Sequence, residues 1–316
     1  MPILKAVGIT KEFPGVKALR NVNFEVEAGE VHGLIGENGA GKSTLVKILT
    51  GVYKQDSGQI LLNGENVNID NPHIAFEYGI SVIHQELNLL RYLNVTTNVL
   101  LGGYFPKKGP FIDWKKANNE VQSYVNLVDD SISSKSIIRN MSISKAQLIE
   151  ISKSFSRNAK IVFMDEPTSS LSNTEQEKLF KVIEEMKKKG VAVIYISHRL
   201  EEIMNICDRI TVLRDGQYID TLKVEDTNID HLVSLMVGRE VEDRYPKVYN
   251  QIGEKMLEVK NLNIHNTLHN ISFNVRKGEI LGLYGLVGAG RTELARAIFG
   301  VDKIDSGEIF INSKKG

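Results

Sequence analysis

The sequence predicts an α/β fold in which a glycine-rich loop joins a strand to a helix, followed by a partial second copy of the same unit. Three observations lead to this prediction. The stretch Gly36–Thr44 reads Gly-Glu-Asn-Gly-Ala-Gly-Lys-Ser-Thr and fits the phosphate-loop pattern G-x-x-x-x-G-K-[ST]. Short apolar runs of strand length alternate with segments of helical spacing. Residues 270–313 repeat residues 21–64, which indicates a tandem arrangement.

Gly36–Thr44 is flanked by the elements that a phosphate site needs. The apolar run at 31–35 predicts a strand before it, and the spacing of residues 45–49 predicts a helix after it, closed by Gly51. The glycines allow backbone N–H groups to turn toward an anion, and the helix adds the positive end of its dipole. In such a loop the lysine reaches the β- and γ-phosphates, and the serine binds Mg²⁺. The residues expected to hold the nucleotide are Gly36, Glu37, Asn38, Gly39, Ala40, Gly41, Lys42, Ser43 and Thr44.

Length and composition limit the class of protein. The chain has 316 residues, of which 25% are charged and 7% aromatic, as is typical of a soluble α/β protein. Its formal net charge is zero, whereas nucleic-acid binders usually carry a basic surplus, so we expect no nucleic-acid partner. The single cysteine, Cys207, excludes an internal disulfide and a multi-cysteine metal site. No apolar run approaches the roughly 18 residues of a membrane span, and Met1–Lys5 has no signal-peptide pattern. We therefore expect a cytosolic protein that reaches a membrane only through a partner.

The first elements are predicted to be strands around a turn. Apolar runs at 3–9 and 22–26 indicate two strands, joined through Phe13–Val16, a turn-like stretch with an aromatic side chain. An exposed Phe13 on such a loop could stack on a purine ring, although a core position explains the same residue. Turn residues at both ends of 57–64 predict a hairpin-like strand.

Polar residues follow two of the predicted strands. Gln85 comes after the apolar run 80–83, and in parallel sheets ligands gather at the carboxyl ends of strands. Gln85 is therefore placed to contact Mg²⁺ or a water, with a plain polar loop residue as the alternative. Asp165 and Glu166 follow the apolar run 161–164, and buried carboxylates need partners. We predict that Asp165 holds Mg²⁺ and that Glu166 is the general base for the attacking water.

A histidine follows the next predicted strand. Ser172–Glu175 fits a capping box and opens a helix that we expect to end at Gly190. The run 191–197 predicts the following strand, and His198 stands just past its end. A lone histidine is more often structural, but its position among polar residues at strand ends favours a catalytic role. His198 would then hydrogen-bond a γ-phosphate or the attacking water.

Between residues 89 and 156 the strand pattern gives way to helical spacing, which predicts a helical insert. Helices are expected at 93–101, 114–128 and 142–155, with a break at 107–110. Ser142 begins the last of these helices. Its hydroxyl is either an N-cap or part of a second anion site.

These patterns divide the chain into a first domain at 1–240, a polar and aperiodic linker at 241–255, and a partial copy at 256–316. The repeat aligns without a gap after a shift of 249 positions, and about 20 of the 44 paired residues are identical.

The copy is altered where chemistry is expected. Its loop, Gly285–Thr292, has Arg291 in place of Lys42, and a planar guanidinium does not replace a compact ammonium. The copy also lacks about four residues where Phe13 would fall, and it stops at Gly316, before any counterpart of the strands that end in polar residues. We therefore expect a degenerate second domain in a truncated chain.

Taken in this order, the motifs resemble those of the ATP-binding cassette (ABC) ATPases. They are a Walker A loop at Gly36–Thr44, a Q-loop at Gln85, a signature region at Met141–Gln147, a Walker B strand ending at Asp165 with Glu166 after it, and a switch histidine at His198. The resemblance covers residues 1 to about 240. It implies a P-loop NTPase fold of the ABC ATPase type, with a mixed sheet, an antiparallel β-subdomain and a helical subdomain at about 89–156, and it implies ATP and Mg²⁺ as cofactors.

Longer stretches look like the monosaccharide importer ATPases, the group that handles ribose, galactose and methyl galactoside, xylose, allose and autoinducer 2. They are Phe13–Leu19, His84–Leu89, Ile112–Trp114, Tyr195–Ile203, Met236–Glu240 and the altered loop of the second copy. This resemblance implies that Phe13 stacks on adenine and that the helical insert and the Gln85 loop contact transmembrane permease subunits. It also implies an extracytoplasmic sugar-binding receptor as an indirect partner, pairing with a second ABC domain or a homodimer partner, and a peripheral place on the cytoplasmic face of the cell membrane.

The signature region departs from the family pattern, because Met141–Lys145 stands where Leu-Ser-Gly-Gly-Gln is usual. Cassettes pair head to tail, so Ser142 would face the altered loop around Arg291. The loop at Lys42 would face a signature that this chain does not contain, and we expect the chain alone to bind MgATP but to hydrolyse it slowly. Two alternatives stay open: a soluble non-transport ABC ATPase, and a nucleotide-binding subunit with little hydrolysis of its own.

Overall fold

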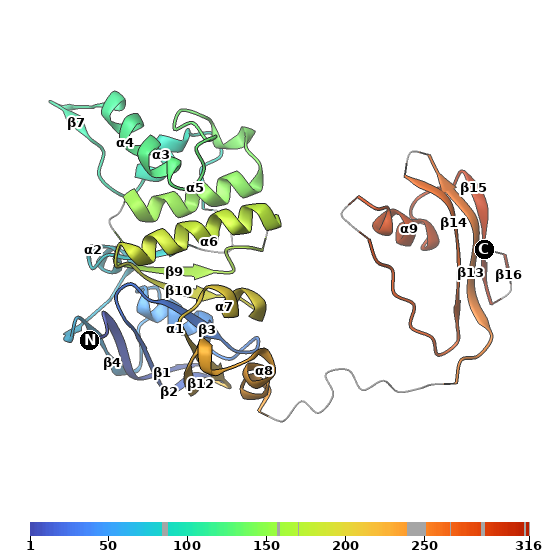
Figure 1. The fold of residues 1–316 in the computed structure, drawn as a ribbon, viewed down its shortest axis with the longest axis horizontal. Coiled ribbons are helices and arrows are strands. Elements are labelled where there is room, and N and C mark those ends of the chain that lie inside the picture. The colour runs from blue at the N-terminus through green and yellow to red at the C-terminus, as the bar shows by residue number, and fades with distance from the viewer. Residues whose placement is uncertain are drawn as a thin grey trace. The chain divides into compact units, whose positions relative to one another are not determined.

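The structure is a computed structural model that describes residues 1–83, 88–156, 159–169, 171–238, 251–265, 267–285, 288–312 and 314–315. The chain divides into two compact units, residues 1–242 and residues 243–316 (Figure 1).

An antiparallel sheet opens the first unit. Its strands, in spatial order, are β2 (Val16–Val26), β1 (Leu4–Phe13), β4 (Ser57–Leu62) and β5 (Glu65–Val67). The first two strands are longer than predicted because their pairing continues as far as Phe13 and Val16, which leaves Pro14 and Gly15 as the turn. Gly15 has a φ of 81°, a conformation that glycine adopts without steric cost.

A six-stranded mixed sheet forms the centre of this unit. Its order is β12 (Gln217–Lys223), β11 (Arg209–Arg214), β3 (Val31–Ile35), β10 (Ala192–Ile196), β9 (Ile161–Asp165) and β6 (Ile80–Ile83). The strands from β11 to β6 pair in parallel, and β12 is antiparallel at one edge. Every residue of β3 and β10 is buried, as in parallel strands that are covered on both faces. The predicted α/β fold with a mixed sheet and an antiparallel subdomain is confirmed.

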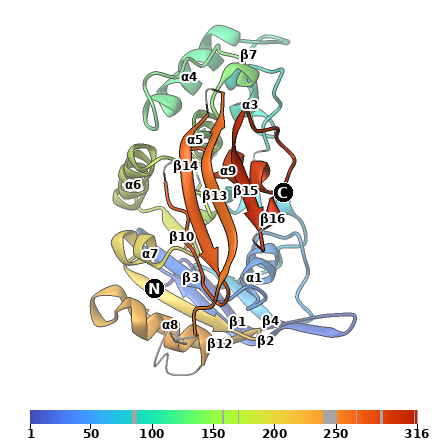
Figure 2. The ribbon, with the colours of Figure 1, turned by 90° about the vertical axis from the view of Figure 1, so that its right-hand side faces the viewer.

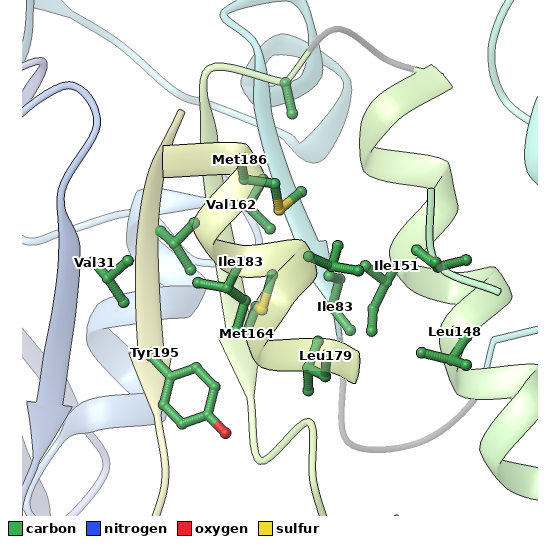
Figure 3. Packing of buried hydrophobic residues seen from close by; sticks show 14 of the residues in the cluster. Val31, Ile83, Leu148, Ile151, Val162, Met164, Leu179, Ile183, Met186 and Tyr195 are labelled. Atoms are coloured by element: carbon green, nitrogen blue, oxygen red, sulfur yellow. The ribbon is translucent and has the colours of Figure 1, made fainter. Parts of the chain in front are cut away.

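The two faces of the central sheet belong to different cores. On one face the sheet packs against α5 (Ile143–Ser156), α6 (Asn173–Lys188) and α7 (Leu200–Ile206), and Figure 3 shows Val162 and Met164 of β9 beside Ile183 of α6. On the other face it packs against α1 (Lys42–Leu49), α2 (Pro72–Glu77) and the antiparallel sheet. Successive residues of β9 alternate between these cores because side chains of a strand point alternately to its two faces.

The expected helical insert contains α3 (Val95–Leu100), α4 (Trp114–Asn126) and α5, with a short 3₁₀ turn, η1 (Ile138–Asn140), before α5. Where the sequence indicated only a break, the chain forms a small hairpin of β7 (Lys107–Lys108) and β8 (Phe111–Ile112). Figure 1 shows β7 projecting at the outer end of this helical region.

The segment that follows His198 contains elements that the sequence analysis did not predict. They are α7, β11, β12, the 3₁₀ turn η2 (Val224–Asp226) and α8 (Ile229–Val237). Among the residues that the structure describes, no helix is both long enough and apolar enough to cross a bilayer.

The second unit repeats the antiparallel sheet and the loop helix of the first. Its strands lie in the order β14 (Leu268–Arg276), β13 (Lys255–Ile264), β15 (Ser306–Ile311) and β16 (Lys314–Lys315), and its helix is α9 (Arg291–Ile298) (Figure 2). Leu257 pairs with Val275 just as Leu4 pairs with Val26. The residues before the second loop form no strand, and Ile280 and Tyr284 are 99% and 98% exposed.

Candidate functional site

The glycine-rich loop leaves the end of β3 and leads into α1. Gly36, Gly39 and Gly41 have φ values of 154°, 87° and 99°. A residue with a side chain adopts these backbone conformations only with strain. A Cβ on Gly41 would also lie 2.8 Å from the carbonyl oxygen of Ala18. The first N–H groups of α1 have no carbonyl within the helix to pair with, so the loop and the helix present donors to one region. The local geometry is that of an anion cradle.

The side chain of Lys42 turns back onto this loop. Its Nζ donates hydrogen bonds to the carbonyl oxygens of Gly36 at 2.6 Å and Glu37 at 3.0 Å. Burial lowers the pKa of Lys42 below its ordinary value, and the carboxylates of Asp165 and Glu166 oppose this shift. The ammonium is therefore within electrostatic reach of the acidic pair, although it belongs to an element far away in the sequence.

Asp165, Glu166 and His198 lie at the carboxyl ends of two neighbouring parallel strands. Asp165 is the last residue of β9 and stands opposite Ile196 of β10. The N–H of Glu166 donates to the carbonyl oxygen of Ile196 at 2.8 Å, and this bond holds Glu166 in the left-handed region, at a φ of 47°. Nδ1 of His198 lies 3.0 Å from Oε1 of Glu166. The structure thus joins two of the predicted catalytic residues and brings Lys42 near them.

A buried carboxylate that binds residues next to this pair was not found by sequence reasoning. Glu202, on α7, is 4% exposed and accepts hydrogen bonds from four side chains. The donors are the hydroxyl of Thr168 at 2.8 Å, the hydroxyl of Tyr195 at 2.9 Å, the hydroxyl of Ser197 at 3.1 Å and Nη1 of Arg199 at 3.1 Å. Burial, together with the charge of Glu202, raises the pKa of Tyr195, so its hydroxyl remains a donor.

The Glu202 network, which consists of Glu202 and these four donors, ties together the two loops that carry the candidate catalytic pair. Thr168 follows Glu166 in the loop after β9. Ser197 and Arg199 flank His198, and the hydroxyl of Ser197 also accepts from the N–H of Arg199 at 3.0 Å. The only indication of this network in the sequence was the position of Glu202, in the first turn of α7 and four residues after His198.

Two other predicted site residues, Phe13 and Ser142, have different surroundings. Phe13 lies between the two alternatives, an exposed loop aromatic and a core residue: it ends β1, is half-buried, and packs edge-to-face on Tyr53 with ring centroids 5.4 Å apart. Nζ of Lys11 lies 5.5 Å from its ring centroid. The hydroxyl of Ser142 accepts from the N–H of Lys145 at 3.3 Å, so Ser142 caps α5, which is one of the two roles expected for it. Gln85 lies outside the described residues.

The predicted capping box at the start of α6 is present. The N–H of Ser172 donates to the carboxylate of Glu175 at 2.9 Å, and hydrogen bonds from Ser144 and from Ser172 hold the pKa of Glu175 below its ordinary value. α6 ends at Lys188, and Gly190 follows with a φ of 80°. Glu175 therefore also links α5 to α6.

In the second unit, the two described glycines before α9 match their counterparts in the first loop, and the cation differs. Gly288 and Gly290 have φ values of 87° and 83°, and Arg291 begins α9 where Lys42 begins α1. Arg291 is exposed. The conformations of Gly39 and Gly41 are therefore repeated, whereas the positive φ of Gly36 and the lysine are not.

Comparison with known proteins identifies the family. A family profile described as "ABC transporter" matches residues 19–169 and 268–315, which together make up more than half of the chain. The chain belongs to the ABC transporter family. Both units of this ABC protein take part in the match, the second through its loop and the strands around it.

Curated relatives and solved structures agree with this assignment. The ABC chain is 48% identical over 314 residues to the galactose/methyl galactoside import ATP-binding protein MglA of Haemophilus influenzae, covering 99% of this chain and 62% of the relative. It is also 48% identical to the ribose import ATP-binding protein RbsA of Clostridium perfringens, covering 98% of this chain and 62% of that one. The chain thus spans about three fifths of the length of these relatives. The ADP conformation of MJ1267, an ATP-binding cassette of an ABC transporter, has a TM-score of 0.66 at 27% identity, covering 76% of this chain and 100% of MJ1267.

Proposed function

We propose that this ABC protein is an ATP-binding and ATP-hydrolysing subunit that energises a bacterial importer of monosaccharides. One observation carries the proposal: Glu166 and His198 are in contact at the ends of adjacent parallel strands, and Lys42 of the glycine-rich loop is within electrostatic reach of the same carboxylate. The sugar class follows from the relatives that are 48% identical, which are named as galactose/methyl galactoside and ribose import proteins.

The residues of the first unit fit a nucleoside triphosphate. The glycines of Gly36–Thr44 direct N–H groups and a helix N-terminus toward one region, and a triphosphate would replace the loop carbonyls as the acceptor for Lys42. We infer that Phe13, partly exposed at the end of β1, packs against the adenine ring. Ser142 would contact the nucleotide of a facing cassette.

The donor set also fits Mg²⁺. The hydroxyl of Ser43, the carboxylate of Asp165 and the side-chain oxygen of Gln85 are the hard oxygen ligands that Mg²⁺ prefers. Among the described residues no group of three or more His, Cys, Asp or Glu side chains could hold a metal. This is compatible with Mg²⁺, which takes few protein ligands and completes its shell with phosphate and water. When bound, the ion would neutralise charge on the phosphates.

Glu166 is the proposed general base, and His198 holds that base in position. A carboxylate oxygen of Glu166 would accept the proton of the attacking water, while the contact of its Oε1 with Nδ1 of His198 limits rotation of the side chain. Lys42 would hold the transferring phosphate in line with that water. The Glu202 network connects the loop after β9 with the loop after β10, and so keeps Glu166 and His198 together.

We further propose that the chain works with transmembrane permease subunits, with a sugar-binding receptor outside the membrane acting through the permease. The bound ATP would lie between the first unit of the chain and a second ABC domain, which belongs either to the same chain or to a homodimer partner. The chain would then be peripheral on the cytoplasmic face of the membrane. The helical region and the Gln85 loop are the surfaces that would meet the permease.

Nucleotide binding and single-turnover hydrolysis of the 316-residue chain test this proposal. Lys42→Ala should weaken MgATP binding at least tenfold, whereas Lys54→Ala, an exposed lysine outside the loop, should leave binding unchanged. Glu166→Gln should bind MgATP with wild-type affinity and hydrolyse it about 10²- to 10³-fold more slowly. A wild-type chain that does not bind MgATP, or a Glu166→Gln chain that turns over like wild type, would contradict the proposed ATPase. Failure to co-purify with a sugar permease would contradict the import role alone.

A further inference from the structure

The hairpin that projects from the helical region combines exposed aromatic side chains with lysines. We call residues 104–116 the basic hairpin. Tyr104 and Phe111 are 73% and 75% exposed, and Trp114 is 46% exposed. The exposed basic side chains of this segment are Lys107, Lys108, Lys115 and Lys116.

Each face of this two-stranded ribbon carries both kinds of side chain. Lys107 pairs with Ile112, and Lys108 pairs with Phe111. Cross-strand partners point to the same face, so each face presents one ammonium beside one apolar group. A long lysine stem next to an exposed ring suits an interface in which the ring enters an apolar layer and the ammonium stays at its polar edge.

The hairpin is held in place by its own base. The N–H of Asp113 donates to the carbonyl oxygen of the buried Pro106 at 2.8 Å, and Phe105 packs edge-to-face on Trp114 with ring centroids 6.1 Å apart. The carboxylate of Asp113 accepts from the N–H of Lys116 at 3.0 Å and so caps α4. The exposed rings are therefore presented by a defined structure.

We propose that the basic hairpin docks on a membrane surface that contains anionic phospholipid. Residues 104–116 contain four lysines and a single carboxylate, that of Asp113, whereas the whole chain has zero net charge. The nearest further carboxylate on α4, Glu120, accepts from the hydroxyl of Tyr124 at 3.3 Å. Attraction to an anionic surface must therefore arise locally, and each lysine near such a surface contributes about a fivefold factor in binding. Aromatic side chains are also favoured at the membrane interface.

Within the helical region that we propose meets the permease, the basic hairpin is assigned to lipid and not to a permease loop because of its charge. Cytoplasmic loops of membrane proteins carry an excess of lysine and arginine, which would repel these four lysines, whereas the cytoplasmic leaflet is negative. The inference goes beyond the proposed function, because a bilayer contact of this kind needs neither ATP nor a permease.

The single tryptophan of the chain, Trp114, reports on this contact directly. We would mix the 316-residue chain with vesicles of phosphatidylcholine alone or with one third phosphatidylglycerol, and follow co-sedimentation and Trp114 emission. We expect binding and a blue-shifted emission only with the anionic vesicles, loss of both at high salt, and quenching of Trp114 by brominated lipid. Lys107→Glu/Lys108→Glu should weaken binding at least tenfold, and Phe111→Ser should reduce it and the blue shift together.

The matched control is Lys54→Glu/Lys181→Glu, which changes the net charge equally at exposed positions on α6 and near α1. It should bind anionic vesicles like the wild type, and all variants should unfold at the wild-type temperature. Absence of vesicle binding, equal binding to both vesicles, or equal losses in the control and the hairpin variant would each overturn the proposal. Binding without any change in Trp114 emission would do so too.

Discussion

Replacing Glu202 by glutamine isolates the contribution of the Glu202 network to hydrolysis. The substitution keeps the size of the side chain but removes its charge. With the amide oxygen at the position of Oε2, the bonds from Thr168, Tyr195 and Ser197 remain, and the amide NH₂ turns toward Arg199. Hydrogen bonds to a charged acceptor contribute about 1.5–3 kcal/mol and neutral ones about 0.5–1.5 kcal/mol, so each of the three retained bonds weakens by about 1 kcal/mol. Arg199 loses its acceptor as well, so the free energy of unfolding of the first unit should fall by about 3 kcal/mol or more.

The kinetic consequence separates a positioning role from a purely structural one. Glu202 accepts hydrogen bonds from both sides of His198 and from the loop after Glu166, but from no residue of the phosphate loop at Gly36–Thr44. Glu202→Gln should therefore slow single-turnover hydrolysis about 10- to 100-fold while MgATP affinity changes less than about twofold, because small misplacements of a catalytic group have effects of this size.

Urea unfolding, MgATP binding and single-turnover hydrolysis would be measured on the wild type, Glu202→Gln and Glu201→Gln. Glu201 is the exposed neighbour of Glu202 on α7, so its substitution controls for the loss of one charge on the same helix. The reasoning is refuted if Glu202→Gln loses stability but hydrolyses ATP at the wild-type rate. It is equally refuted if the two variants behave alike.

Three further outcomes follow from the same structure. His198→Ala should retain MgATP binding and lose about 10²-fold in single-turnover rate, because Glu166 loses the contact at 3.0 Å; a wild-type rate would contradict this. Gly41→Ala should weaken MgATP binding at least tenfold in a titration, since alanine resists a φ of 99° and its Cβ would meet the Ala18 carbonyl; unchanged affinity would argue against the cradle. Glu175→Gln should cost about 1 kcal/mol in urea unfolding at pH 7. Because the folded-state pKa of Glu175 is lowered, its stabilisation is present above its ordinary pKa and disappears as the pH falls through the lowered one, so wild type and variant should converge in acid.

The parts of the site that could be predicted from sequence are those specified by a short segment. Gly36–Thr44 dictates a loop conformation and a helix start, and Asp165, Glu166 and His198 each follow an apolar run whose strand end fixes where they lie. The ends of parallel strands share one edge of a sheet, which is why residues so far apart in sequence could be expected to meet.

What could not be predicted depends on partners from distant segments. Glu202 reads as a solvated helix residue until Tyr195, Ser197 and Thr168 are seen to surround it. The half-buried state of Phe13 depends on Tyr53, which follows α1 and reaches back to the β1–β2 turn. The strands β11 and β12 were missed because their apolar runs are short, and only pairing of β11 with β3 places them in the central sheet.

The two copies of the loop separate these local and distant contributions within one chain. Gly288 and Gly290 repeat the φ values of the first loop to within 16°, and α9 begins at the same position as α1, although residues 281–285 form no strand. These two glycine conformations and the helix start therefore do not require a strand before the loop. The site needs more, because Lys42 acquires its acidic neighbours through the pairing of β9 with β10 and of β10 with β3. A phosphate-loop motif alone thus predicts a conformation, and the polar residues at the ends of the neighbouring strands determine whether it becomes a catalytic site.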